Sequence, residues 1–369
     1  MAPTMDIDEN DKEVKDDEAT KTTSTPKPKK KKDAGPSASA ETAYFHPDMS
    51  LAQDIHRLAM IHAGKLSAED ATAIIGCKPG ELLEKVMSRV GTGKKSLDDA
   101  MKENEARYKI KEEEEGKDVY VAAKEEEEKK GDEEEEDEED RPLLNPSLYR
   151  HLQSTLSYSA SPNNAPLTEE NLKTLEGHHE AILSQLNEAI TKAKEEAGDM
   201  EVLHAYMDIA RYCAKSSTKD AALEAYDDVL ALPKLSVGKR LDAHLEMARV
   251  ASFWGDYARM KTVLDSAAKA IANGGDWDRR NRLKVYQALS MILVRDVEEA
   301  SKLLVEGIAT FSCTELCSYP EFITYAIVTN LLYLKRTELK KSIIDGSEVL
   351  QVAKDIPVVV SESVSVVYA

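Results

Sequence analysis

The sequence predicts an all-α protein in which helical pairs stack into a right-handed solenoid, with a disordered N-terminal tail and an acidic insert. Three observations favour this fold class. Alanine, leucine, glutamate and lysine are abundant, and all four have high helix propensity. Aromatic residues make up only 5% of the chain and glycines number 16, which argues against an all-β sandwich. Apolar residues also recur at helical spacing, in units that repeat along the second half of the chain.

Residues 1–43 are predicted to be disordered. They combine Asp, Lys, Thr, Pro and Ser with few aliphatic side chains, so folding would not bury enough apolar surface to offset the ordering of the backbone. A basic cluster in this tail consists of Lys27, Lys29, Lys30, Lys31 and Lys32. The cluster fits a nuclear import signal or a polyanion-binding tag. The alternative is a charge run that is merely solvated.

Residues 44–111 predict a small helical module. Apolar side chains recur at helical spacing over 51–61 and again over 82–90. His56 and His62 lie near the first apolar stripe, with no carboxylate or cysteine at the spacing of a metal ligand. They are therefore interpreted as helix-surface or core histidines.

Residues 112–140 form an acidic low-complexity insert. This stretch holds 18 acidic and 4 basic side chains, which accounts for most of the formal charge of −20. Repulsion between like charges and the lack of apolar periodicity predict a solvated linker or a frayed, highly charged helix. Capture of a basic partner is the functional alternative. The remainder of the chain is close to neutral.

Residues 141–272 predict helical repeats of the tetratricopeptide type. A long amphipathic helix is expected over 168–198. Helix–turn–helix units follow, and their second helices are expected to open at Asp220, Asp256 and Asp296, which lie 36 and 40 residues apart. Each carboxylate is predicted to accept hydrogen bonds from the first free amides of its helix. Each pair leaves an apolar face that only its neighbour can cover, so the pairs stack.

The segment GGDWDRRNRLKVYQ is the most distinctive in the chain. Its two glycines are expected to end one helix, Asp276 to cap the next, and Trp277 to anchor the turn. The cations that follow oppose the helix dipole and need an acidic partner, for which Asp276 and Asp278 are local candidates. The candidate motif consists of Gly274, Gly275, Asp276, Trp277, Asp278, Arg279, Arg280 and Arg282. It is interpreted as a buried joint between repeats, and the functional alternative is a contact with an acidic neighbouring protein.

No catalytic or metal-binding pattern is found in the sequence, so the chain is predicted to be no enzyme and to use no cofactor or metal. The segment from Gly91 to Lys95 lacks the spacing of a P-loop, and no histidine pair encloses a glutamate as in zinc proteases. Cys313 and Cys317 lack further ligands and are interpreted as small core residues. The 4 scattered cysteines, the polar N-terminus and the lack of a long apolar run predict a reducing compartment, no secretory signal and no membrane span.

The glycine–tryptophan segment resembles a family of lid subunits of the 26S proteasome regulatory particle, called non-ATPase subunit 7 in yeast-style naming and subunit 6 in metazoan naming. The strings FSCTELCSYPEFITYAIVTNLL and SEVLQVAKDIP resemble the same family. The resemblance covers residues 44–63 and 142–357 and is strongest over 273–357. It implies helical repeats that continue over 273–357 toward a PCI domain, which is a helical bundle followed by a winged helix.

The resemblance implies a structural scaffold in the complex that degrades ubiquitinated proteins. Its partners would be other lid subunits and the ATPase base, with no membrane, nucleic acid or small-molecule substrate, and its location cytoplasm and nucleus. The lid's deubiquitinating activity belongs to a different, metal-bearing subunit. Residues 358–369 are β-branched and serine-rich where the family continues into its PCI domain, so a C-terminally truncated chain is expected.

Two alternative functions stay open from the sequence. One is a subunit of the related signalosome complex, against which the GGDWDRRNR string discriminates. The other is an RNA-associated PCI-like protein of a translation initiation complex, with Lys27–Lys32 and Arg279–Arg282 as its contacts. RNA binding that falls steeply with added salt would distinguish the second alternative.

Overall fold

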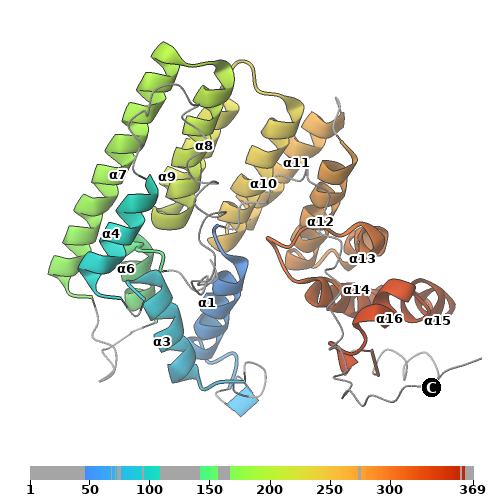
Figure 1. The fold of residues 1–369 in the computed structure, drawn as a ribbon. Helices are drawn as coiled ribbons and strands as arrows, with labels where there is room; N and C mark the ends of the chain where they lie inside the picture. Colours follow the sequence, from blue (N-terminus) through green and yellow to red (C-terminus); the bar gives the residue numbers. More distant parts are fainter. Residues whose placement is uncertain are drawn as a thin grey trace, which may run out of the picture. The chain divides into compact units, whose positions relative to one another are not determined.

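The computed structural model describes residues 46–67, 69–70, 72, 76–93, 95–108, 142–156, 167–272, 276–357 and 360–361. Residues 43–369 group as one unit, which is the part described below. Within the described ranges the structure is helical and holds no strand, which confirms the all-α prediction (Figure 1). The basic cluster of the tail and the acidic insert lie outside these ranges. Among the described helices, none combines the length and the low polarity that crossing a bilayer requires.

Ahead of the repeats, the helices whose bounds the structure describes are α1 (Met49–His62), α3 (Pro79–Val90), α4 (Leu97–Tyr108) and α6 (Pro146–Thr155). Helices α1, α3 and α6 share one apolar core, whose members include Leu51, Val86 and Leu152. The backbone before α6 is tied to the end of α3, because the Leu143 amide donates to the Arg89 carbonyl at 2.8 Å. The structure therefore packs α1 and α3 with α6, whereas α4 packs against α7.

The long helix predicted over 168–198 is α7 (Glu169–Glu196). Thr168 caps it, and the Thr168 hydroxyl accepts from the Asn171 amide at 3.2 Å. One stripe of α7 is buried, formed by Leu172, Leu175, Ile182, Leu186, Ile190 and Ala193. The apolar spacing in the sequence thus gave both the extent of this helix and its packed face.

Three antiparallel helical hairpins follow α7. They are α8 (Asp199–Ser216) with α9 (Lys219–Leu230), α10 (Val237–Phe253) with α11 (Tyr257–Ala272), and α12 (Trp277–Leu293) with α13 (Val297–Gly307). A single buried apolar cluster runs through all three hairpins and continues into the helices after them. In Figure 1 each hairpin lies beside the next in chain order, so the predicted stack of helical pairs is confirmed.

Two of the hairpin turns have the same backbone geometry. Gly255 and Arg295 adopt positive φ angles of 72° and 64°, and each is followed by the aspartate that caps the next helix. The amides of Asp256 and Asp296 donate five residues back, to the carbonyls of Ala251 and Met291, at 2.8 and 2.9 Å. This is the Schellman ending, which favours glycine at the position of positive φ. The predicted caps at Asp256 and Asp296 are confirmed, because their carboxylates accept from the amides three residues on.

The turn between α8 and α9 shows that the cap predicted at Asp220 was wrong. Thr218, and not Asp220, caps α9, and its hydroxyl accepts from the Ala221 amide at 3.4 Å. Asp220 lies exposed in the first turn of the helix. This turn has two residues between its helices, whereas the other two turns have three. Matching the units by their aspartates therefore misplaces the start of the first one.

The described chain ends in shorter helices. The segment η2 (Ile308–Thr310) leads to α14 (Tyr319–Tyr333), and α15 (Arg336–Leu339), η3 (Lys340–Ile344) and α16 (Ser347–Val352) follow. A capping box starts α14, where the Ser318 hydroxyl accepts from the Glu321 amide while the Glu321 carboxylate accepts from the Ser318 amide. These helices extend the core of the hairpins beyond α13.

Substitutions at the positive-φ positions of the two Schellman turns should change the free energy of unfolding in opposite directions. Arg295→Gly should raise the free energy of unfolding by about 0.5 to 1 kcal/mol, because it removes the strain of a side chain at positive φ. Gly255→Ala should lower the same free energy by about 1 kcal/mol, because it introduces that strain. Urea unfolding followed by circular dichroism measures both. Arg295→Ala is the control and should stay near wild type, so equal stability of the glycine and alanine variants would contradict the argument.

Candidate partner-contact site

The predicted motif lies at the start of α12. Gly274 and Gly275 fall outside the described residues, as do the five lysines of the N-terminal cluster. Asp276 caps α12 as predicted, because its carboxylate accepts from the Arg279 amide at 2.8 Å. The remaining motif residues separate into two groups, one directed inward and one exposed.

Trp277 does not anchor the turn, which corrects the prediction for this residue. It is 68% exposed, although it is the first residue of α12. The start of α12 is held instead by the Asp276 cap and by Asp278, whose carboxylate accepts from the Ser312 hydroxyl at 3.1 Å. Arg280 is also exposed, and it makes no ion pair with the residues that the structure describes.

Arg279 joins the hairpin of α12 to that of α10. Its Nε and Nη2 donate to the two carboxylate oxygens of Asp242 on α10, at 2.9 and 2.7 Å, and it also pairs with Asp276. These hydrogen bonds to Asp242 raise the pKa of the guanidinium. Asp276 was expected as a partner for the cations, whereas Asp242, 37 residues upstream, was missed.

The close fit at this joint depends on a glycine in α10. A Cβ atom added at Gly238 would lie 3.3 Å from the Cζ of Arg279. A larger side chain there would push the guanidinium away from Asp242. The starts of α10 and α12 are therefore in direct contact.

Arg282 points into the protein toward Glu315, which lies between α13 and α14. Arg282 Nη2 donates to Glu315 Oε1 at 2.9 Å, and the Tyr286 hydroxyl donates to the same oxygen at 3.1 Å. The Glu315 side chain has no exposed surface. Burial raises the pKa of the Tyr286 hydroxyl, and the Glu315 carboxylate adds to this shift. The Tyr286 hydroxyl therefore stays protonated and available as a donor.

The same arrangement occurs one hairpin earlier, around Glu246 on α10. Arg211 donates to both Glu246 oxygens, at 3.1 and 2.7 Å, and the Tyr226 hydroxyl donates to Glu246 Oε2 at 2.9 Å. Arg249, also on α10, is 1% exposed, and the Glu246 and Glu315 carboxylates balance its charge. The joint network, as we name it, comprises Arg211, Tyr226, Glu246, Arg249, Arg282, Tyr286 and Glu315.

Sequence reasoning missed most of the joint network, although one signal was present. Glu246 and Arg249 interrupt the apolar run of α10 and occupy positions that the helix buries. A charge at a core position is rare unless a partner neutralises it. Complementary charges on the neighbouring repeats could therefore have been sought.

His46, ahead of α1, lies against the same region. Burial lowers the pKa of its imidazole to about 3, and the nearby cations Lys215, Arg249 and Arg89 add to this effect. The ring is therefore neutral at pH 7. The segment before α1 therefore lies close enough to the repeats at this residue to sense the charges of Lys215 and Arg249.

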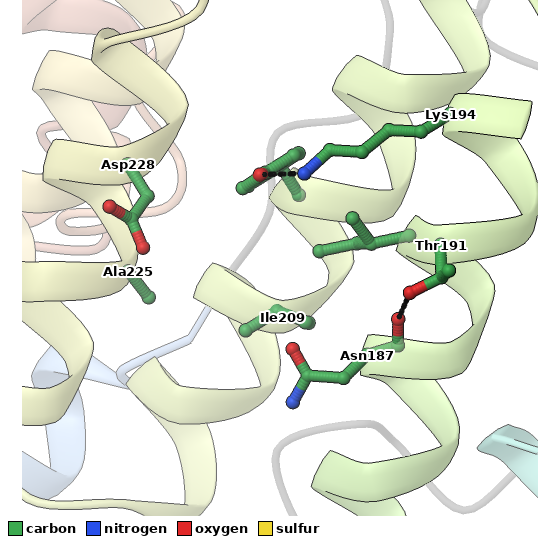
Figure 2. Close-up of a pocket in the computed structure, with 8 residues that line it drawn as sticks. Asn187, Thr191, Lys194, Ile209, Ala225 and Asp228 are labelled. Atoms are coloured by element: carbon green, nitrogen blue, oxygen red, sulfur yellow. Dashed lines mark hydrogen bonds between the residues drawn. The ribbon is translucent and has the colours of Figure 1, made fainter.

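A shallow cavity of about 280 Å³ lies elsewhere, between α7, α8 and α9. Figure 2 shows two hydrogen bonds between its lining residues: Lys194 Nζ donates to the Tyr206 hydroxyl at 2.7 Å, and the Thr191 hydroxyl donates to the Asn187 backbone carbonyl at 3.1 Å. None of the motif residues lines it. In the described ranges no group of histidine, cysteine and carboxylate side chains is arranged for a metal, and Cys313 and Cys317 lie buried in the core as interpreted.

Comparison with known proteins identifies what the repeats resemble. Residues 168–342, from α7 to η3, match the family model described as 26S proteasome subunit RPN7. The 26S proteasome regulatory subunit RPN7 of Saccharomyces cerevisiae is 39% identical over 173 residues, which are 47% of this chain and 40% of that protein. The 26S proteasome non-ATPase regulatory subunit 6 of Dictyostelium discoideum is 36% identical over 183 residues, 50% of this chain and 48% of the relative.

A plant relative gives the same result. The 26S proteasome non-ATPase regulatory subunit 6 homolog of Arabidopsis thaliana is 33% identical over 191 residues, 52% of this chain and 49% of the relative. The resemblance predicted from the sequence is therefore confirmed, and the matched family is one of proteasome regulatory subunits. The chain spans about half the length of the curated relatives that it matches.

The joint network predicts which glutamates matter for stability. Glu315→Ala should lower the free energy of unfolding by about 3 to 5 kcal/mol, because it removes the nearest counter-charge of the buried Arg282, which keeps only Asp242 at 3.7 Å, and leaves the buried Arg249 with Glu246 alone. Glu306→Ala is the matched control. Glu306 pairs with Lys284 at 2.9 Å on the surface, and its loss should change stability by less than about 1 kcal/mol. Urea unfolding of both variants tests this difference, which would vanish if Glu315 were solvated.

The neutral His46 predicts a dependence of stability on pH. Because its folded pKa of about 3 lies below the ordinary 6.5, its contribution is present above pH 6.5 and is lost as pH falls toward 3. Between pH 7 and pH 5 the loss should amount to about 1 to 2 kcal/mol. Urea unfolding of wild type and His46→Gln at both pH values isolates this term from the other histidines. Parallel losses in the two proteins would show that His46 does not contribute.

Proposed function

We propose that this chain is a non-catalytic scaffold subunit of the 26S proteasome regulatory particle, acting in its lid through contacts with other proteins. The observation that carries the proposal is the match of residues 168–342 to the RPN7 family, which spans α7 and the three stacked hairpins. The relatives cited above are all named as 26S proteasome regulatory subunits. The chain would thereby help to assemble the particle that handles ubiquitinated proteins.

The chemistry of the described residues supports a scaffold. The buried carboxylates Glu246 and Glu315 are bonded to arginine and tyrosine donors from neighbouring helices. Groups in that state fix one helix against the next, because both oxygens of Glu246 and Oε1 of Glu315 accept from donors of the protein itself. The buried charges of the repeats thus serve to hold the hairpins together.

The RNA-associated alternative loses most of the contacts that the sequence offered for it. Arg279 and Arg282 are engaged with Asp242 and Glu315 inside the repeats, so they cannot reach a phosphate backbone without breaking those pairs. Of the arginines in the predicted RNA contact at 279–282, Arg280 alone is exposed. The signalosome alternative gains no support from the matched relatives, which carry proteasome names.

The finer features of the proposal concern partners, location and the end of the chain. The partners are other lid subunits and the ATPase base, and the chain acts in the cytoplasm and in the nucleus, with Lys27–Lys32 as its import signal. Residues 273–357, where the sequence resemblance is strongest, would continue the helical repeats toward a PCI-type domain, and helices α14 to α16 lie in the later part of this range.

Affinity isolation of the tagged full chain from its source cell tests the proposal. Proteasome ATPases and lid subunits should be recovered with the chain after nuclease treatment, and mass spectrometry identifies them. The untagged cell supplies the background. Recovery of signalosome subunits, or of ribonucleoproteins lost on nuclease treatment, without proteasome subunits would overturn the proposal.

A further inference from the structure

Each of the three hairpins begins with an exposed apolar side chain. Met200 is the second residue of α8, Val237 the first of α10 and Trp277 the first of α12. They are 51%, 36% and 68% exposed, respectively. Their positions are 37 and 40 residues apart, which is the spacing of the repeat. An apolar side chain at this place is therefore a repeated feature of the stack.

Direct contacts place these three positions along one edge. Asp199, next to Met200, accepts from Lys234 at 2.7 Å, and Lys234 lies just ahead of Val237. Gly238, next to Val237, lies against the Arg279 guanidinium, two residues after Trp277. The starts of α8, α10 and α12 thus follow one another, as their common end in Figure 1 also shows.

The edge carries one exposed cation without an ion pair in the described structure, Arg280, at its α12 end. Trp277, Arg280 and Lys284 lie three and four residues apart, so they share one side of the helix. Arg280 is exposed without an ion pair in the described structure, and Lys284 has only the exposed Glu306 as its partner. The carboxylate of Asp276 is neutralised by Arg279, and Asp278 lies about a quarter turn or more from this side of the helix.

We propose that Met200, Val237, Trp277 and Arg280 form a docking rim for an acidic segment of a neighbouring subunit. Resting on the proposed function, this inference names the surface and the chemistry of the contact. Tryptophan and arginine are the residues most enriched at the energetic centres of protein interfaces. The indole would bury against apolar side chains of the segment while Arg280 binds its carboxylates. The motif residues then have two roles: Arg279 and Arg282 hold the joint between helices, and Trp277 and Arg280 bind the partner.

The test compares four tagged full-length chains by isolation of the particle from the source cell: wild type, Trp277→Ala, Arg280→Glu and the control Lys261→Glu. Lys261 is exposed on α11, away from the rim. Trp277→Ala and Arg280→Glu should each reduce recovery of the neighbouring subunit at least tenfold, while Lys261→Glu recovers it as wild type does. Circular dichroism and urea midpoints should match wild type in all variants, because all three side chains are exposed.

A photocrosslinking residue at position 277 identifies the segment directly, with the same residue at Tyr257 as control. Tyr257 is the first residue of α11 and is 37% exposed at the opposite end of the hairpin. In the isolated particle, position 277 should crosslink to a peptide of another subunit that is rich in Asp and Glu, and Tyr257 should not yield that peptide. Exchange of those acids for lysine should restore recovery with Arg280→Glu.

The outcomes separate the two proposals. Equal recovery of the particle with all four chains, or a crosslinked peptide without an excess of acidic residues, would overturn the rim and leave the proposed function standing. A wild-type chain that recovers no proteasome subunit would overturn the proposed function and, with it, the rim.

Discussion

Glu246 and Glu315 are carboxylates enclosed between neighbouring hairpins, and a charge in such a place is tolerated only where donors surround it. Each carboxylate meets an arginine and a tyrosine from other helices, and Arg249 lies buried with its charge balanced by both. Sliding one hairpin along the next would keep apolar side chains in contact but would separate these donors from their acceptors. We therefore interpret the joint network as what fixes the register of the stack, a role well attested for buried polar groups elsewhere.

The pairing of buried charges also determines which residues of the motif are exposed and can contact another protein. Because Asp242 and Glu315 draw Arg279 and Arg282 inward, the helical period turns Trp277 and Arg280 outward at the start of α12. The two interpretations of the motif, joint or contact, thus apply to different residues of one short segment. Packing within the chain and contact with a neighbour are geometrically linked, since a hairpin out of register would also displace the exposed indole.

Much of the fold could be predicted from the sequence because it depends on local spacing. The buried stripe of α7 and the caps at Asp256, Asp276 and Asp296 follow from helical period and from the free amides at helix starts. Thr218 was missed because the first turn is one residue shorter, so that matching the units by their aspartates passed over a threonine that is itself a favourable capping residue. The partners Asp242 and Glu315 were missed because pairing between residues more than 30 positions apart in the sequence is set by tertiary packing. Trp277 was wrongly expected to anchor the turn, because the burial of a large side chain depends on whether a neighbouring helix packs over it, and the local sequence does not show this.

The similarity to the RPN7 family has a different meaning at the motif residues that hold the joint than at those that are exposed. The segment that carries it most clearly contains Asp276, Arg279 and Arg282, and the joint requires those three whatever the chain binds. Likeness at these positions therefore argues for a shared way of stacking hairpins. Trp277 and Arg280 have no such internal requirement, because one is largely exposed and the other has no partner in the described structure. Similarity to the family at Trp277 and Arg280 would therefore indicate a shared partner, because within this motif the packing of the chain does not itself require these two side chains.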